Sequence, residues 1–85
     1  EKPIVAQYKN IDLHLLECFA MLMRERNVTR AAERMGLSQS AMSEALGRLR
    51  ERFDDPLLVR GSRGMQPTPH ALSLIARIGE ATETL

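Results

Sequence analysis

The segment from 28 to 52, VTRAAERMGLSQSAMSEALGRLRER, constrains the fold more than any other part of the chain. Its first part carries an apolar face at helical spacing, formed by Ala31, Ala32 and Met35. We expect a short helix over Arg30–Met35 with Thr29 as its N-cap, because a threonine hydroxyl can accept a bond from an unpaired helix N–H. Gly36 should end this helix, since glycine adopts the left-handed conformation without a Cβ clash.

A second helix is expected over Gln39–Phe53, with Leu37 in the angle between the two helices and Ser38 as its N-cap. Its apolar face at helical spacing comprises Met42, Ala45, Leu46, Leu49 and Phe53. The opposite face is short and polar in the first turn and basic later, where Arg48, Arg50 and Arg52 stand.

Short polar side chains near the start of a helix can reach base edges in a DNA groove, and arginines further along can meet phosphates. The polar first turn offers Gln39, Ser40, Ser43 and Glu44. The joint spacing therefore predicts a helix-turn-helix motif over 28–47 whose second helix binds DNA. A plain helical hairpin is the alternative interpretation.

The charge distribution favours the DNA-binding interpretation. The whole chain of 85 residues has a net charge of only +1. Between Arg24 and Arg63, however, nine arginines face six acidic residues, a local charge of +3, whereas each flank carries −1. Positive charge concentrated on one module is the electrostatic footprint of a nucleic-acid binder.

Residues before the helix-turn-helix predict a loose arm over 1–10 and then a helix from the N-cap Asp12 to about Arg26. This helix carries one apolar stripe of Leu13, Leu16, Ala20 and Met23, with Leu15, Phe19 and Leu22 beside it, and such breadth predicts a helix that is buried on much of its surface. The single cysteine, Cys18, excludes an internal disulfide and a multi-cysteine zinc site, and we expect it to be a small buried apolar side chain.

Residues 57–67 predict a two-stranded wing after the helix-turn-helix. Leu57–Val59 should form the first strand, the glycine-containing segment 60–64 the turn, and Met65 and Gln66 the second strand, closed by Pro67. Arg60 and Arg63 flank and occupy the tip of this wing, where they could meet phosphates or enter the minor groove. The alternative is an exposed basic loop without DNA contact.

A last helix is expected over 69–85, because Thr68 can cap it and Pro69 suits its first position. Its apolar stripe comprises Leu74, Ile78, Ala81 and Leu85, widened by Leu72 and Ile75. Such a stripe either folds back on the domain or pairs with the same helix of a second chain. The overall prediction is a mainly α fold: three helices and a two-stranded wing over 11–68, then a long linker and dimerisation helix.

No enzyme, metal site or membrane span is predicted. The sequence offers no nucleophile with a plausible base, no paired catalytic carboxylates, no phosphate loop and no metal-ligand constellation. It also shows no signal peptide and no apolar stretch long enough to cross a bilayer, so we expect a cytoplasmic protein.

The sequence resembles the N-terminal DNA-binding domain of LysR-type bacterial transcriptional regulators. The resemblance rests on NIDLHLLECFAML, and on NVTRAAERMGLSQSAMSEALGRLRERFDDPLLVRGSRGMQPTP. It is strongest to the branch with regulators of nodulation and of aromatic degradation, in which the Ala-Leu-x-Arg-Leu-Arg stretch recurs, here Ala45–Arg50.

The resemblance implies a dimer, formed through the last helix, that binds an inverted repeat with a T-N11-A core and controls transcription. It implies base contacts by Gln39, Ser40, Ser43 and Glu44, backbone contacts by Thr29, Arg30, Ser38 and Arg48, and minor-groove entry by Arg63. It further implies an additional C-terminal domain that binds a small-molecule inducer and forms tetramers; no cofactor is expected in these 85 residues.

Two positions depart from the family pattern. Many relatives have proline where Ser40 stands, and many have arginine or asparagine where Glu44 stands. A carboxylate repels phosphate but can accept a hydrogen bond from cytosine N4. Glu44 therefore either reads a different base or faces away from DNA. The competing function is a winged-helix protein-interaction module with only nonspecific DNA affinity.

Overall fold

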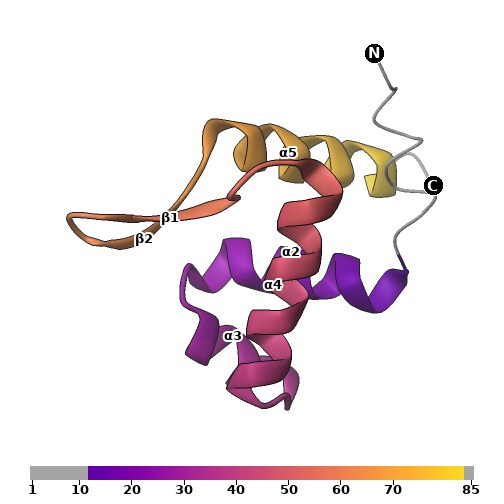
Figure 1. Ribbon diagram of the computed structural model, residues 1–85. Helices are drawn as coiled ribbons and strands as arrows, with labels where there is room; N and C mark the ends of the chain where they lie inside the picture. The colour runs from indigo at the N-terminus through magenta and orange to yellow at the C-terminus, as the bar shows by residue number, and fades with distance from the viewer. Residues whose placement is uncertain (1–11, 84–85) are drawn as a thin grey trace.

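The computed structural model describes residues 12–83, with side chains described as far as Ile78. The elements in chain order are α2 (Leu13–Glu25), α3 (Val28–Met35), α4 (Gln39–Phe53), β1 (Leu58–Gly61), β2 (Gly64–Pro67) and α5 (Pro69–Glu83). Helix α4 runs through the middle of the molecule, α5 lies across one end and α3 at the other, and the strand pair projects to one side (Figure 1). This arrangement confirms the predicted winged helix-turn-helix with a following helix. The predicted arm over 1–10 lies outside the described residues.

Capping residues define the start of each helix. The Asp12 carboxylate accepts a 2.7 Å bond from the Leu15 N–H at the start of α2, as predicted. Helix α3, however, begins at Val28, and its N-cap is Asn27, whose side chain accepts a 2.8 Å bond from the Arg30 N–H. The prediction of Thr29 as N-cap is therefore wrong. Asn27 caps as well as threonine does, and the earlier start places the half-buried Val28 against the core.

The turn between α3 and α4 follows the sequence prediction. Gly36 ends α3 with φ of 68°, the left-handed conformation that glycine adopts at least cost. Ser38 caps α4 by accepting a 3.1 Å bond from the Ala41 N–H. The observed bounds of α4, Gln39–Phe53, are those predicted.

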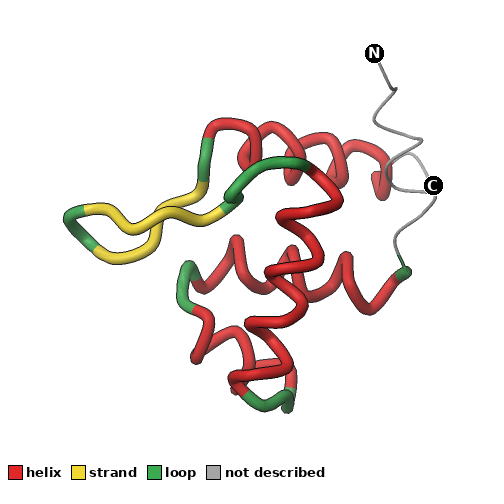
Figure 2. The backbone as a smooth tube through the Cα atoms, viewed as in Figure 1, coloured by secondary structure: helices red, strands yellow, loops and turns green. Residues whose placement is uncertain are grey.

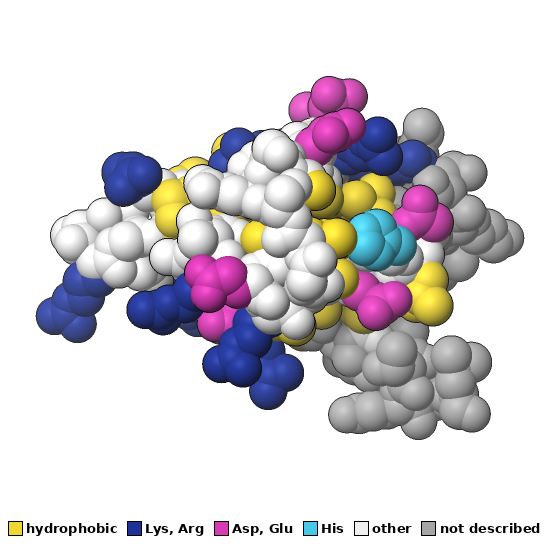
Figure 3. Space-filling model, turned by 90° about the horizontal axis from the view of Figure 1, so that it is seen from below, with side chains coloured by type: hydrophobic (Ala, Val, Ile, Leu, Met, Phe, Trp, Pro, Cys, Tyr) yellow, Lys and Arg dark blue, Asp and Glu magenta, His cyan; other side chains and the backbone are white. Residues whose placement is uncertain are grey.

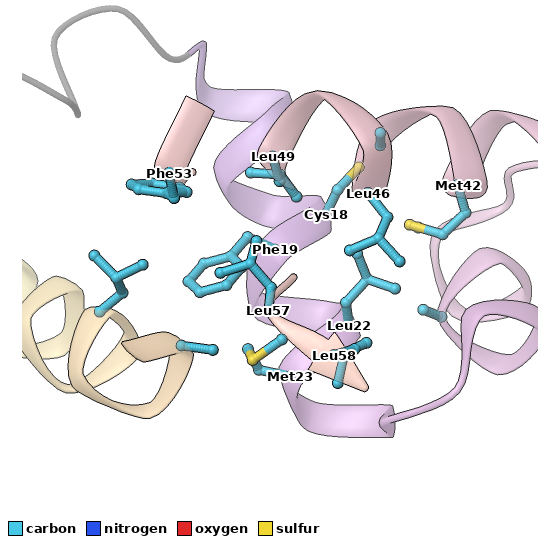
Figure 4. Close-up of a cluster of buried hydrophobic side chains, with 14 of the residues drawn as sticks. Cys18, Phe19, Leu22, Met23, Met42, Leu46, Leu49, Phe53, Leu57 and Leu58 are labelled. Atoms are coloured by element: carbon cyan, nitrogen blue, oxygen red, sulfur yellow. The ribbon is translucent and has the colours of Figure 1, made fainter. Parts of the chain in front are cut away.

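The hydrophobic core lies where α2, α4, the start of β1 and α5 meet (Figure 4). All five predicted apolar side chains of α4 are buried in it. The rings of Phe19 and Phe53 stack at a tilt, with centroids 5.9 Å apart. This packing fixes the angle at which α4 crosses α2, and so the direction in which the start of α4 points.

The buried face of α2 differs from the prediction. Its centre is formed by Cys18, Phe19, Leu22 and Met23, which confirms Cys18 as buried. Leu13 is 72% exposed and Ala20 is exposed, so these two members of the predicted apolar surface lie outside the core. Helix α2 is apolar around much of its circumference, and helical spacing alone does not choose between two adjacent stripes. The face of α2 that is buried is decided by where α4 packs against it.

The wing is an antiparallel strand pair, in which Val59 lies opposite Gln66 and Arg60 opposite Met65 (Figure 2). The prediction of a hairpin is confirmed, but the first strand begins one residue later than expected and includes Arg60 and Gly61. Leu57 stands outside the strand because its backbone is left-handed, with φ of 66°, while its side chain is completely buried. Burial of a leucine side chain offsets the cost of that conformation.

Helix α5 folds back on the domain. Thr68 caps it by accepting a 3.0 Å bond from the Ala71 N–H, and Pro69 is its first residue, as predicted. Ala71 and Leu74 are completely buried, so Leu74 is not available to a second chain in this conformation, contrary to its assignment as a dimerisation residue. Ile75 and Ile78 pack on the edge of the core. The side chains of Ala81 and Leu85 lie outside the described part.

Candidate nucleic-acid interface

A concavity of about 700 Å³ lies between the start of α3, the start of α4 and the wing. Six of the residues predicted to contact DNA line it: Thr29, Arg30, Gln39, Ser43, Arg60 and Arg63. These residues come from three separate segments of the chain. The packing of α3 and α4 against α2, with the hydrogen bonds from Arg50 of α4 to the base of the wing, brings them to one surface. The geometry therefore assembles a single candidate site from residues that the sequence placed on separate elements.

The concavity is electropositive. Its charged lining consists of four arginines, Arg26, Arg30, Arg60 and Arg63, and one carboxylate, Glu25. Glu25 in turn forms a 3.6 Å ion pair with Arg34, which lies outside the concavity. Seen from below, several arginine side chains, in dark blue, lie on the wing side of the molecule (Figure 3). Exposed guanidinium groups are well suited to bind phosphate, because they are charged and can donate two parallel hydrogen bonds to its oxygens.

The start of α4 presents Gln39 and Ser43 to the concavity, one helical turn apart and both exposed. Their side chains make no hydrogen bond within the described part of the chain, so amide and hydroxyl are available to a base edge. The N-terminal end of α4 also carries the positive end of the helix dipole, which favours an anion nearby.

The remaining predicted contacts of α4 lie outside the concavity. The hydroxyl of Ser40 is 3.2 Å from that of Ser38, which itself accepts the capping bond. Glu44 pairs with Arg48 at 3.3 Å, and both side chains are more than two-thirds exposed. The structure therefore groups Gln39 and Ser43 with the wing, and places Ser40, Glu44 and Arg48 on the adjoining exposed surface of α4.

Arg50 has a different role from the one its place in the basic turns indicated. Its Nε atom donates a 2.7 Å hydrogen bond to the carbonyl oxygen of Pro56, and Nη2 donates a 3.0 Å bond to that of Leu58. The side chain therefore ties the recognition helix to the base of the wing. Helical spacing gave no signal for this contact, because it depends on where the loop after α4 turns.

Two further residues of the concavity were not predicted. Arg26, the C-cap of α2, donates a 3.4 Å hydrogen bond from Nη1 to the Oε1 atom of Gln66 on β2. Both line the concavity. Arg26 and Gln66 lie 40 residues apart in sequence, so no local pattern could have revealed that they pair.

Within residues 12–83, no helix is both long and apolar enough to cross a membrane. Nor do the described side chains include a group of three or more histidine, cysteine or acidic residues that could hold a metal ion.

A helix-turn-helix with an adjoining strand pair and a basic concavity between them defines a winged helix-turn-helix domain. Residues 13–72 match the family described as bacterial regulatory helix-turn-helix protein, lysR family, and the chain belongs to this family. The resemblance stated from the sequence is therefore confirmed.

Curated relatives agree with this assignment. The chain is 44% identical over 77 residues to the HTH-type transcriptional regulator LeuO of Escherichia coli K12, covering 91% of the chain and 24% of LeuO. It is 51% identical over 65 residues to the HTH-type transcriptional regulator YidZ of Salmonella newport, covering 76% of the chain and 20% of YidZ. The chain thus spans about a quarter or less of the length of these relatives. They are transcriptional regulators, which confirms the prediction that the chain is not an enzyme.

Solved structures share the fold. A probable transcriptional regulator of Pseudomonas aeruginosa, PA0477, superposes with a TM-score of 0.79 at 44% identity, over 92% of this chain and 26% of that one. The BenM DNA-binding domain in complex with catB site 1 DNA superposes with a TM-score of 0.63 at 26% identity, over 87% of this chain and 91% of that one.

Proposed function

We propose that this chain is the DNA-reading domain of a longer bacterial LysR-type transcriptional regulator. The observation that carries the proposal is the basic concavity, which places Gln39 and Ser43 of α4 beside Arg60 and Arg63 of the wing. An α-helix fits the major groove of B-DNA, and a wing beside it can reach the neighbouring minor groove. The BenM domain, which has the same fold, is described as a DNA complex.

Each side chain of the site has a chemical role in this proposal. The Gln39 amide can bond an adenine edge at two positions, and Ser43 can donate to or accept from a base. Thr29, Arg30 and Ser38, at the starts of α3 and α4, contact the DNA backbone together with Arg48. Arg63 enters the minor groove and Arg60 supports it. Ser40 and Glu44 contact bases from the exposed surface next to the concavity.

We further propose that two chains bind one inverted repeat with a T-N11-A core, because two-fold related recognition helices read two half-sites. Helix α5 supplies the dimer contact through Ile75 and Ile78, close in sequence to Leu72, which is 49% exposed. Ala81 and Leu85, further along the sequence, complete the proposed contact. In the longer cytoplasmic protein, a C-terminal domain binds a small-molecule inducer and forms tetramers, while the DNA-reading domain itself needs no cofactor.

A fluorescence-anisotropy titration at fixed salt tests the function. One labelled duplex holds an inverted T-N11-A repeat selected by this chain from a random pool, and the other holds the same bases scrambled. Sequence reading predicts a preference of about a thousandfold or more for the selected duplex. Equal weak binding to both would support the interaction-module alternative with only nonspecific DNA affinity.

Two variants test the site. Gln39→Ala should lose about 1–3 kcal/mol of discrimination at one base pair and keep its affinity for scrambled DNA. Arg63→Ala should weaken binding to the selected duplex, most strongly where the minor groove is narrow. Arg24→Ala is the control, because Arg24 is exposed in the last turn of α2 and does not line the concavity. If neither site variant differs from this control, the assignment is wrong.

A further inference from the structure

We propose that Arg26 is a further DNA-phosphate contact, which joins the helix-turn-helix side of the concavity to the wing side. This inference rests on the proposed DNA binding and extends it to a residue outside the helix-turn-helix motif and outside the wing. Three observations carry it: the backbone conformation of Arg26, the absence of an acidic partner for its side chain among the described residues, and its place in the concavity.

The backbone of Arg26 is left-handed, with φ of 52° and ψ of 33°. Its N–H donates a 2.8 Å bond to the carbonyl oxygen of Leu22, which ends α2. Glycine or asparagine occupies such a capping position at lower cost than any long side chain. Capping alone therefore does not account for an arginine at this position.

The charge of Arg26 is not neutralised within the described part of the chain. The neighbouring carboxylate, Glu25, pairs with Arg34 on the other side, at 3.6 Å. Among the described residues, the Arg26 guanidinium donates one hydrogen bond, to the neutral Oε1 atom of Gln66 at 3.4 Å. A guanidinium carries five N–H donors, so most of them remain available to phosphate oxygens.

Arg26 also lies in the concavity together with the other arginines. Gln66 is on β2, where it pairs with Val59 of β1. The Arg26–Gln66 bond therefore links the end of α2 to the wing, and both residues line the concavity. Arg30 lines the helix side of the same concavity, and Arg60 and Arg63 line the wing side. A DNA strand between recognition helix and wing would meet Arg26 between these two groups of positive charge.

The salt dependence of binding tests the proposal, since each phosphate contact adds about 0.9 to the slope of log affinity against log salt. The variants are Arg26→Asn, which tolerates the left-handed backbone without charge, and Arg26→Lys, which keeps the charge. Arg24→Ala is the matched control, because it also removes one exposed arginine, but from outside the concavity. Both the selected T-N11-A duplex and its scrambled version serve as probes.

We expect Arg26→Asn to reduce the slope by about 0.9 per bound chain on both duplexes. Raising salt fourfold then weakens the wild type about 3.5-fold more than the variant, per bound chain. Arg26→Lys should retain the wild-type slope, and Arg24→Ala should not change it. Thermal melting of Arg26→Gly should match or exceed the wild type, because glycine suits the left-handed cap, which separates DNA contact from folding.

An unchanged slope and affinity in Arg26→Asn would overturn the proposal. So would a variant that keeps the slope and loses affinity only for the selected duplex, if Gln66→Ala does the same, because Arg26 would then merely position the wing. If the wild type shows no salt-dependent binding to either duplex, the proposed function itself fails, and this outcome is distinct from the other two.

Discussion

The Thr68 hydroxyl donates a 2.6 Å hydrogen bond to the Oδ2 atom of Asp55, which precedes it by 13 residues. The same carboxylate oxygen accepts a 2.8 Å bond from the Leu57 N–H, and the same hydroxyl accepts a 3.0 Å bond from the Ala71 N–H. The pair therefore joins the loop after α4, the base of the wing and the start of α5. Through it, the recognition helix and the proposed dimerisation helix share one fixed joint.

Replacing Thr68 with valine should destabilise the domain by about 1–2 kcal/mol, because it removes an N-cap and leaves the half-buried Asp55 with fewer partners. Valine keeps the shape of threonine, so packing changes little. Urea denaturation followed by circular dichroism measures the change. Ser73→Ala, an exposed position on the same helix, is the control and should lie within about 0.5 kcal/mol of the wild type. Equal stabilities of the two variants would contradict the proposed joint.

Replacing Arg50 with alanine should weaken DNA binding without removing any side chain from the concavity. The guanidinium holds the carbonyl oxygens of Pro56 and Leu58, and its loss should cost about 1–2 kcal/mol of stability and loosen the wing. If so, Arg63→Ala should reduce DNA affinity less in an Arg50→Ala background than in the wild type, which a double-mutant cycle measures. Arg52→Ala, exposed on the same helix, controls for loss of charge. Additive losses would show that Arg50 does not position the wing.

Local patterns were sufficient to predict most of the fold. The core face of α4, its bounds, the glycine at φ of 68° and the caps Asp12, Ser38 and Thr68 all depend on residues within a few positions of one another. The error at Thr29 has the same origin, since Asn27 and Thr29 are both competent caps. The buried face of α2 could not be chosen in this way, because it depends on where another helix crosses.

Only part of the candidate site was predicted, because local patterns reveal the motifs and not the contacts between distant segments. Gln39, Ser43 and Arg63 follow from the helix-turn-helix and wing patterns, and the structure brings them to one concavity. Arg26 and Arg50 were not assigned, because their partners lie across a turn or across the domain. A contact between distant segments leaves no periodicity in the sequence, so it becomes visible only when the elements are placed in space.

Replacing either of two glycines of the helix-turn-helix with alanine should change the stability of the domain, but in opposite directions. Gly36 has φ of 68°, where a Cβ atom is strained, so Gly36→Ala should destabilise the domain by about 1 kcal/mol. Gly47 lies inside α4, and an added Cβ would meet nothing within 4 Å. Gly47→Ala should therefore stabilise by about 0.5–1 kcal/mol, since alanine favours the helix. Thermal melting distinguishes the two, and a destabilising Gly47→Ala would mean that this surface of α4 is packed more tightly than described.

The stability of the domain should fall at alkaline pH through Cys18. Burial raises the pKa of this thiol above its ordinary value of 9.0, and the nearby Glu17 and Asp12 charges raise it further. The folded state therefore holds the proton more firmly than the unfolded state. The resulting stability is fully present below pH 9.0 and is lost as the pH rises through the higher folded pKa. Urea denaturation across this range should show a steeper decline for the wild type than for Cys18→Ala, and parallel declines would refute the linkage.

Removing the charge of Glu44 should raise nonspecific DNA affinity while leaving stability nearly unchanged. Its 3.3 Å ion pair with Arg48 joins two side chains that are 69% and 68% exposed, and such pairs contribute about 0–0.5 kcal/mol. Glu44→Gln takes a negative charge from the surface beside the concavity and frees Arg48 to bind phosphate. The slope of affinity against salt on scrambled DNA should therefore steepen by up to about 0.9 per bound chain.

The double variant Glu44→Gln/Arg48→Ala identifies the source of that gain. If the freed Arg48 supplies it, the added slope should disappear in the double variant, because glutamine alone cannot bind phosphate as a cation does. On the selected duplex, the proposed base contact of Glu44 is tested separately: if Glu44 reads a cytosine, Glu44→Gln should lower the preference for one base pair by about 1–3 kcal/mol. Binding of duplexes substituted one base pair at a time separates these outcomes, because a change in salt slope affects every sequence alike, whereas a lost base contact affects one position.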